Sequence, residues 1–205
     1  RLIGGTVIWI QCGCSFARFR WRKHMAGKSI DKRRLESFLR RMSDLLDRPS
    51  KIFLLGGSSL TWRGIKSESI DVDLALLENE SDPIPILDAI MSASDFIEAN
   101  ADVMRLGDLL PLPEGYAERA EHAADFDRLT VYHFDPYSIA LTKLARSATK
   151  DINDIDGMLR AGVIECATLH RHFESVLERY KRKASRGDWT DFQRKVEKFY
   201  HEHCE

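Results

Sequence analysis

The sequence predicts an α+β fold, with a small mixed sheet flanked by helices and a helical C-terminal half. Three observations support this prediction. Short apolar or alternating segments typical of strands fall between residues 51 and 134, amphipathic segments typical of helices lie among them, and only helical patterns follow residue 136. A chain of 205 residues is long enough for one or two domains with a substantial hydrophobic core.

The first elements follow from hydrophobic periodicity. A helix is expected over residues 31–47, because apolar side chains recur there at three and four residues before Pro49. Residues 51–55 (KIFLL) are typical of a buried strand that runs into a tight turn at two glycines. Residues 70–76 (IDVDLAL) alternate apolar residues with acidic or small ones, which predicts a second strand.

The rest of the chain is predicted from caps and composition. Ser81 or Asp82 caps one helix, Asp135 and Pro136 begin another, and Gly162 closes a third. Two apolar stripes near the C-terminus indicate a helix pair broken at residues 186–188. The elements expected are helices over 84–96, 116–124, 136–146, 149–159 and from 165 to the end, and strands over 102–106 and 128–134.

The first thirty residues differ from the rest in charge. They hold six of the 31 Lys and Arg residues and none of the 32 Asp and Glu, so the remainder has a formal net charge of −7. Aromatic residues alternate with Arg18, Arg20 and Arg22, a pattern that suits base stacking or a membrane surface. We favour the alternative of a disordered or non-native extension, because Met25 opens a segment typical of an ordinary start. The expected regions are an extension over 1–29, a core over 30–135 and a helical region packed on the core over 136–205.

Composition excludes several classes of protein. With 43% hydrophobic and 31% charged residues the chain is that of a globular protein. No apolar run approaches the ~18 residues that a membrane span needs, so we expect no membrane partner. The acidic body argues against a broad nucleic-acid-binding surface, although it leaves room for a local basic groove. Four cysteines are too few for a disulfide framework, so we expect free thiols and a cytoplasmic location.

The residues that point to chemistry begin with an acid pair. Asp71 and Asp73 are two positions apart on a predicted strand, so they project from one face with Cα atoms roughly 7 Å apart. Two adjacent carboxylates repel each other, and a divalent cation that binds oxygen ligands, Mg²⁺ or Mn²⁺, relieves that repulsion. The alternative is an edge strand whose acids face solvent. The apolar residues between and after the acids favour a strand covered on one face, and with it the metal site.

A turn of small residues precedes the acid pair. Gly56 and Gly57 let backbone N–H groups approach a phosphate closely, and the hydroxyls of Ser58 and Ser59 are suited to donate to phosphate oxygens. Both serines are expected where a helix begins, and a helix N-terminus favours an anion. The alternative is that the glycines only turn the chain.

This order of strand, Gly-Gly-Ser-Ser turn, spacer and acid-bearing strand resembles the signature of the nucleotidyltransferase superfamily, which has the DNA polymerase beta-like fold. The resemblance implies that Asp71 and Asp73 hold the metal that bridges a nucleoside triphosphate. It also implies that the turn from Gly56 to Ser59 binds the phosphates.

Two later segments extend the resemblance. Residues 134–159 (FDPYSIALTKLARSATKDINDIDGML) and 111–120 (PLPEGYAERA) are similar to segments of uncharacterised bacterial and archaeal nucleotidyltransferase-like families related to the abortive-infection (AbiEii-type) toxins. In those families a lysine on a helix and an acid after a Lys-Asp step complete the site, which implies roles for Lys143 and for Asp151 or Asp154. Without the resemblance, Lys143 is typical of a snorkelling surface residue and the two acids of a helix first turn.

The sequence departs from the superfamily pattern at one point. Many members use a third carboxylate from a neighbouring strand, and the predicted strand over 128–134 contains none. Asp102 is the candidate for this position. The departure puts a two-metal mechanism in doubt.

These features predict a Mg²⁺-dependent nucleotidyltransferase that moves a nucleoside monophosphate from a nucleoside triphosphate to a hydroxyl of RNA, such as tRNA, or of a protein. Lys143 would stabilise phosphate charge, and Asp154 or Asp151 would position or activate the acceptor. The resemblance implies a toxin-like context with a cognate antitoxin. Two alternatives stay open: a catalytically weak nucleotide-binding or antitoxin-like interaction module of the same fold, and a helical interaction protein.

Overall fold

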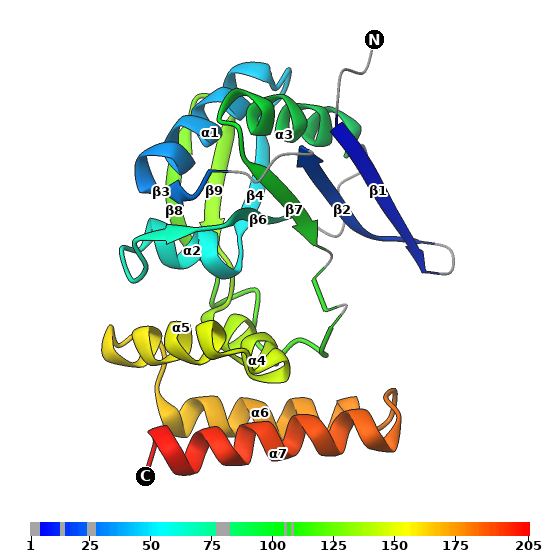
Figure 1. Cartoon of the computed structure of the whole chain (residues 1–205), viewed down its shortest axis with the longest axis vertical. Helices are drawn as coiled ribbons and strands as arrows, with labels where there is room; N and C mark the ends of the chain where they lie inside the picture. The colour runs from blue at the N-terminus through cyan, green and yellow to red at the C-terminus, as the bar shows by residue number, and fades with distance from the viewer. Residues whose placement is uncertain (1–4, 13–14, 24–27, 77–82, 105, 108) are drawn as a thin grey trace. The chain divides into compact units, whose positions relative to one another are not determined.

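The computed structural model of the chain describes residues 5–12, 15–23, 28–76, 83–104, 106–107 and 109–205, and side chains from residue 28 onward. It is an α+β structure that divides into two units (Figure 1). The first unit runs to Leu106 and includes Glu121–His133, and the second holds Gly107–Ala120 and Phe134–Glu205. Residues 107–120 thus group with the helical unit, which no sequence pattern had indicated.

The first unit is built on a mixed sheet. Its strand order is β1-β2-β7-β6-β4-β9-β8, with β6 parallel to β7, β4 parallel to β9 and β4 antiparallel to β6. A second sheet pairs β3 with β5. The strands are β1 (Gly5–Cys12), β2 (Ser15–Lys23), β3 (Ile30–Asp31), β4 (Ser50–Leu54), β5 (Glu68–Ser69), β6 (Asp71–Leu76), β7 (Asn100–Met104), β8 (Glu121–Phe126) and β9 (Leu129–His133).

Three helices belong to the first unit and four to the second, within the part of the chain that the structure describes. They are α1 (Lys32–Leu45), α2 (Gly56–Trp62), α3 (Ile84–Phe96), α4 (Pro136–Arg146), α5 (Thr149–Arg160), α6 (Cys166–Tyr180) and α7 (Arg186–His203). Asp31 caps α1 by accepting from the Arg34 backbone N–H at 2.8 Å, and Asp135 caps α4 as the sequence predicts. None of the described helices combines the length and apolar character that crossing a bilayer requires.

The core of the first unit decides which face of β6 carries the acids. Apolar side chains of α1 and α3 pack against alternate residues of the strands, among them Val72 and Leu74 of β6, which are fully buried. Because side chains alternate along a strand, Asp71 and Asp73 lie on the opposite face. Burying each Leu or Val stabilises the fold by about 1.5–3 kcal/mol, so slipping β6 by one residue is strongly disfavoured.

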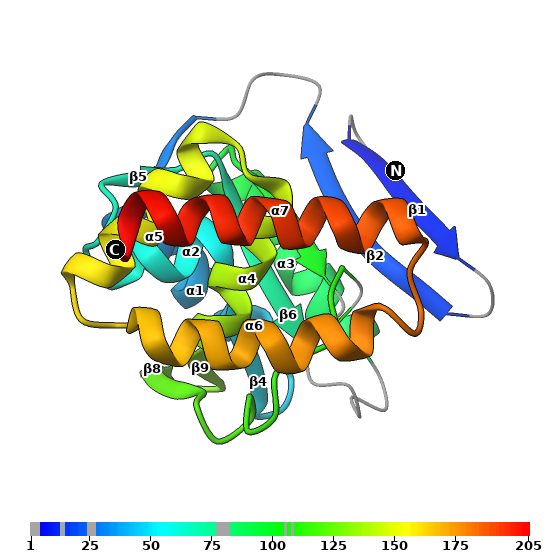
Figure 2. The same cartoon turned by 90° about the horizontal axis from the view of Figure 1, so that it is seen from below.

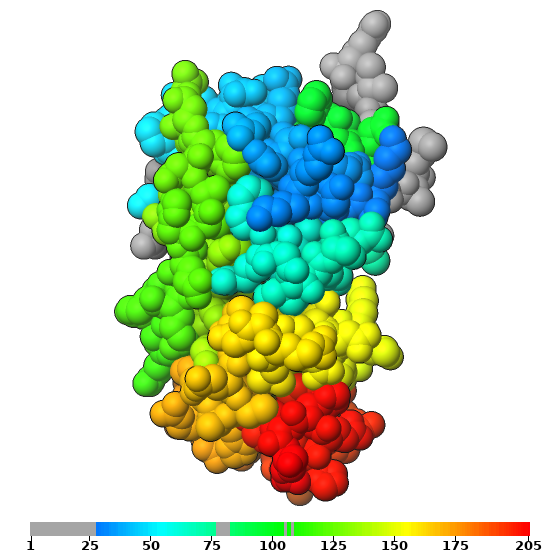
Figure 3. Space-filling model, turned by 90° about the vertical axis from the view of Figure 1, so that its left-hand side faces the viewer, coloured from blue at the N-terminus to red at the C-terminus, as the bar shows by residue number. Residues whose placement is uncertain are grey.

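The second unit contains a helix pair closed by a covalent bond. In Figures 2 and 3 α6 and α7 lie side by side. The ring of Phe173 on α6 lies 5.4 Å from that of Phe192 on α7. Cys166, at the start of α6, forms a disulfide with Cys204, the C-cap of α7. The expectation of free thiols is therefore wrong for these two cysteines. Cysteines 38 residues apart became neighbours because the two helices are antiparallel, which cysteine spacing alone does not reveal.

Two further expectations are wrong. Residues 116–124 do not form a helix: turns are followed by β8, which pairs antiparallel with β9. The helix-favouring composition of this segment is overridden by strand pairing. The break between the last two helices falls at residues 181–185 rather than 186–188, because the Ser185 hydroxyl accepts from the Asp188 backbone N–H and so caps α7 before Arg186.

Two predictions are not tested by the structure: the nature of residues 1–29 and the cap of α3. Strands β1 and β2 lie within residues 1–29, where a disordered or non-native extension was expected. Ser81 and Asp82, the expected caps of α3, lie outside the described residues, and the helix begins after Pro83.

Candidate functional site

The turn after β4 contacts the acid-bearing strand directly. Gly57 donates its backbone N–H to Asp73 Oδ2 at 3.1 Å. Gly56 has φ +41°, and a Cβ at this position would lie 2.8 Å from the same oxygen. The structure therefore brings Gly56, Gly57 and Asp73 together, and the Asp73 carboxylate leaves no room for a Cβ at position 56.

The two serines of the turn hold neighbouring elements in place. Ser58 Oγ accepts from the Asp73 backbone N–H at 2.8 Å and donates to the Asp71 carbonyl oxygen at 3.5 Å. Ser59 Oγ lies 2.9 Å from His133 Nδ1. Both serines are fully buried at the start of α2. In this structure their hydroxyls fix the acid-bearing strand and a histidine, whereas the sequence had suggested phosphate oxygens as their partners.

His133 was not singled out from the sequence. It ends β9, and its register partner on β4 is Leu54, immediately before the turn. Burial lowers the pKa of His133 from 6.5 to about 4, and the positive charges of Arg63 and Lys32 act in the same direction. The imidazole is thus neutral at pH 7 and hydrogen-bonds Ser59. The sequence feature that points to His133 is its position at the carboxyl end of a predicted strand.

This pKa predicts a pH-dependent stability. The folded protein binds fewer protons at His133 than the unfolded chain between pH 4 and 6.5, so the free energy of unfolding falls as the pH falls through that window. Between pH 7 and pH 5 the free energy of unfolding of the wild type should fall by about 2 kcal/mol more than that of a His133→Asn variant. Urea denaturation at the two pH values measures this difference. His122→Gln, at an exposed histidine, is the matched control. Parallel pH profiles for wild type and His133→Asn would contradict the assignment.

The turn itself is expected to be intolerant of a methyl group. A Cβ on Gly57 would lie 2.3 Å from Ser69 Oγ and 3.1 Å from Ser69 Cβ. We expect Gly57→Ala to lower the free energy of unfolding by about 1–3 kcal/mol, and Ser69→Ala in the same chain to recover part of this loss. Gly187→Ala is the control, because its added Cβ meets nothing closer than 3.9 Å. Equal unfolding midpoints for the Gly57 and Gly187 variants would show that the turn accommodates a Cβ at position 57, contrary to the prediction.

A polar row continues onto the neighbouring strand. In the parallel pairing of β6 with β7, Asp71 is opposite Asn100 and Asp73 is opposite Asp102. Asn100 Nδ2 donates to Asp71 Oδ1 at 3.2 Å, and Asp102 is buried. Register partners share a face of the sheet, so Asp102 occupies the position next to the acid pair that the sequence had left as a candidate.

The carboxylates of Asp71 and Asp73 are suited to bind magnesium together with a phosphate substrate. Asp71 and Asp73 are only partly buried, and Mg²⁺ is commonly bound by one or two carboxylates together with substrate phosphates. Among the side chains that the structure describes, no group of three or more His, Cys, Asp or Glu is gathered closely enough to hold a metal ion. The residues present therefore fit a metal that arrives with a phosphate substrate, rather than one held by protein ligands alone.

Lys143, Asp151 and Asp154 come together in the second unit. Lys143 Nζ lies 2.6 Å from Asp154 Oδ2 and 3.3 Å from Asp151 Oδ1, and Arg146 Nη2 lies 2.8 Å from Asp151 Oδ1. The three side chains are at most 9% exposed. The alternative of a snorkelling surface lysine is therefore wrong. Asp151 does lie in the first turn of α5, yet its carboxylate is turned inward to the two cations.

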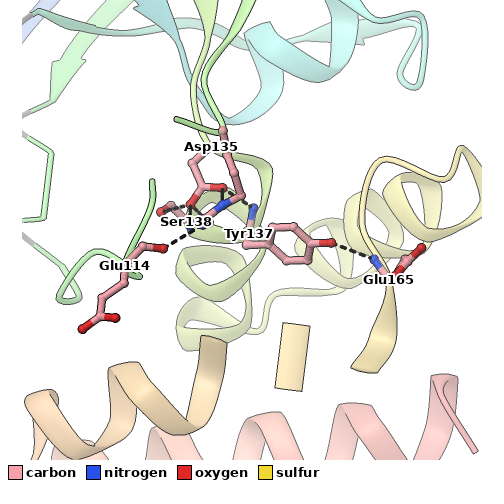
Figure 4. A network of polar contacts seen from close by, with 6 residues as sticks. Glu114, Asp135, Tyr137, Ser138 and Glu165 are labelled. Carbon is pink, nitrogen blue, oxygen red and sulfur yellow. Dashed lines mark hydrogen bonds and ion pairs between the residues drawn. The ribbon is translucent and has the colours of Figure 1, made fainter. Parts of the chain in front are cut away.

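The segment 111–120 is tied to the start of α4. Arg119 contacts Asp135 through Nε at 2.7 Å and Nη2 at 3.0 Å, and it donates to the Glu114 carbonyl oxygen at 2.7 Å. Asp135, fully buried, also accepts from the Ser138 hydroxyl at 2.6 Å and from the Tyr137 and Ser138 backbone N–H groups (Figure 4). A bidentate arginine thus explains structurally why this loop groups with the helical unit.

Comparison with known proteins gives one family. A family model described as "Nucleotidyltransferase of unknown function (DUF6036)" matches residues 33–202, which include all the candidate site residues from Gly56 to Asp154. Neither the search of curated proteins nor the search of solved structures gives a match.

Proposed function

We propose, from the premise that the chain belongs to this nucleotidyltransferase family, that it is a Mg²⁺-dependent enzyme that transfers a nucleoside monophosphate from a nucleoside triphosphate to a hydroxyl group. The observation that carries the proposal is the contact between the Gly56–Gly57 turn and the acid strand, with Gly57 N–H donating to Asp73 Oδ2. This contact places the glycine turn beside the carboxylates, as a site for a metal-bound triphosphate requires.

In the proposed reaction the acceptor hydroxyl oxygen attacks the α-phosphorus in line. The new O–P bond forms, and the hydroxyl gives up its proton to the carboxylate that activates the acceptor. The bond from the α-phosphorus to the bridging oxygen breaks, and pyrophosphate leaves with that oxygen. Asp71 and Asp73 would hold the metal, which when bound offsets the negative charge of the triphosphate. The Asn100 and Gly57 contacts orient the two carboxylates, and Ser58 fixes their strand through its backbone.

The residues of the second unit have a proposed role through the sequence resemblance. Lys143 would stabilise phosphate charge, and Asp154 or Asp151 would position or activate the acceptor. The contacts of Lys143 with both acids hold the three side chains together in one buried ion cluster. The RNA or protein acceptor, the toxin-like context and a cognate antitoxin belong to the proposal on the same ground.

The decisive experiment is a transfer assay. The full chain is incubated with each of the four nucleoside triphosphates, labelled on the α-phosphate, together with Mg²⁺ and bulk cellular RNA or protein. We expect label on one acceptor class and release of pyrophosphate, and EDTA should prevent both. Label on RNA and label on protein identify the acceptor separately.

The alternative is a nucleotide-binding module without catalysis. It is favoured by the lack of a gathered set of three metal-ligating side chains among the described residues. It predicts that a nucleoside triphosphate with Mg²⁺ raises the melting temperature while no pyrophosphate is released. That pair of results would replace the enzymatic proposal by the binding one.

A further inference from the structure

The helical unit contains a pocket that none of the sequence motifs indicates. Its volume is about 300 Å³, and it is lined by nine residues of α5, α7 and the end of α4. Four of the nine carry a permanent positive charge, one is a histidine and one is an acid: Arg146, Arg194, Lys195, Lys198, His203 and Glu202. Cations therefore outnumber acids among the lining residues, and the carboxylates of Asp151 and Asp191, which pair with three of these cations, are not part of the lining.

The α7 cations of the lining form ion pairs with nearby carboxylates. A phosphate can replace these carboxylates or bind the cations beside them. Arg194 Nη2 lies 2.6 Å from Asp191 Oδ1, and Lys198 Nζ lies 3.7 Å from Glu202 Oε1. The Arg194 and Lys198 side chains are 68% and 66% exposed, and ion pairs in such positions contribute only about 0–1 kcal/mol. Lys195 also contacts Asp191, so a single carboxylate is shared by two cations.

Other lining residues also have ionic or ring contacts. Arg146 contacts Asp151, a carboxylate that Lys143 also neutralises. His203 stacks on Phe199 with ring centroids 4.6 Å apart, and its Nδ1 lies 2.8 Å from Asp156 Oδ1. The disulfide of the neighbouring Cys204 ties the end of α7, where His203 lies, to the start of α6.

We propose that this pocket binds a phosphate group. Arginine and lysine side chains from two helices converge on it, and arginine N–H groups match the geometry of phosphate oxygens. The volume is at the lower end of the range for small-ligand pockets, which suits one phosphate with an attached sugar. A phosphodiester of a nucleic-acid strand and the phosphate of a free nucleotide share this chemistry, and the experiment separates them.

The test measures binding of a labelled single-stranded RNA oligonucleotide to the full chain by fluorescence anisotropy, with ATP and inorganic phosphate as competitors. The protein carries Asp71→Asn and Asp73→Asn, which removes the carboxylates that would hold a metal-bound triphosphate, and failure of the proposed transfer reaction leaves this result unaffected. If two phosphates are neutralised, affinity for the RNA should fall about sevenfold between about 50 and about 200 mM salt.

The variant is Arg194→Gln with Lys198→Gln, which should lose most of this salt dependence and bind about tenfold more weakly at low salt. The matched control is Arg182→Gln with Lys183→Gln, which removes the same charge from exposed positions outside the pocket. Loss in the pocket variant alone supports the proposal. Competition by ATP or phosphate at comparable concentration then identifies a free-nucleotide site, and no competition identifies a strand site. Equal loss in both variants, or no loss in either, overturns the proposal.

Discussion

Asparagine at positions 71 and 73 is expected to lower the rate of nucleotidyl transfer by about a thousandfold or more while leaving the fold intact. The replacement keeps the shape of both side chains. An amide oxygen still accepts from Gly57 N–H and from Asn100 Nδ2, so the contacts that position the two side chains survive. The replacement removes the negative charge that would hold a cation.

The measurement is the initial rate of label transfer, with the melting temperature of each variant recorded beside it. Asp125→Asn with Asp127→Asn is the matched control, because these acids are 66% and 84% exposed and belong to the same unit. We expect the control to retain the wild-type rate. Transfer at the wild-type rate by the Asp71 and Asp73 variant would remove these residues from the mechanism.

Methionine in place of Lys143 is expected to lower the free energy of unfolding by about 3–5 kcal/mol, because it leaves two buried carboxylates without their shared ammonium group. For a chain of this size the melting temperature should fall by about 10 °C. Lys150→Met, at an exposed position of α5, is the control and should melt close to wild type.

A second substitution tests the cause of that loss. Asp154→Asn added to Lys143→Met removes the carboxylate nearest the lost ammonium group, so part of the stability should return. If Lys143→Met melts like wild type, the ion cluster does not stabilise the fold.

The acid strand and its turn were predictable from the sequence because local patterns determine them. Alternation in IDVDLAL follows from burial of one face of β6. A Cβ at position 56 would meet Asp73 and one at position 57 would meet Ser69, so glycine is needed at both positions of the turn. Asp135 and Pro136 begin α4 as predicted for the same reason: a cap depends on neighbouring residues.

What the sequence did not reveal depends on contacts between distant residues. The Ser59–His133 hydrogen bond joins positions 74 residues apart. Arg119 contacts Asp135 because residues 107–120 belong to the second unit rather than to the unit that contains the sheet. Cys166 and Cys204 are neighbours only through the antiparallel packing of α6 and α7. The β8 strand was missed because pairing with β9, rather than local propensity, determines its conformation.

The pairing of Asp73 with Asp102 in the sheet constrains the length of the link between α3 and β7 as well as the residues at the two positions. An insertion of one residue between Ile97 and Asn100 would exchange the two faces of β7. Ala101 and Val103 would then stand beside the carboxylates, and Asp102 would enter the hydrophobic layer beneath α3. The length of this short link is therefore as constrained as the identity of the acids, and insertions there should be tolerated far less well than insertions in surface loops.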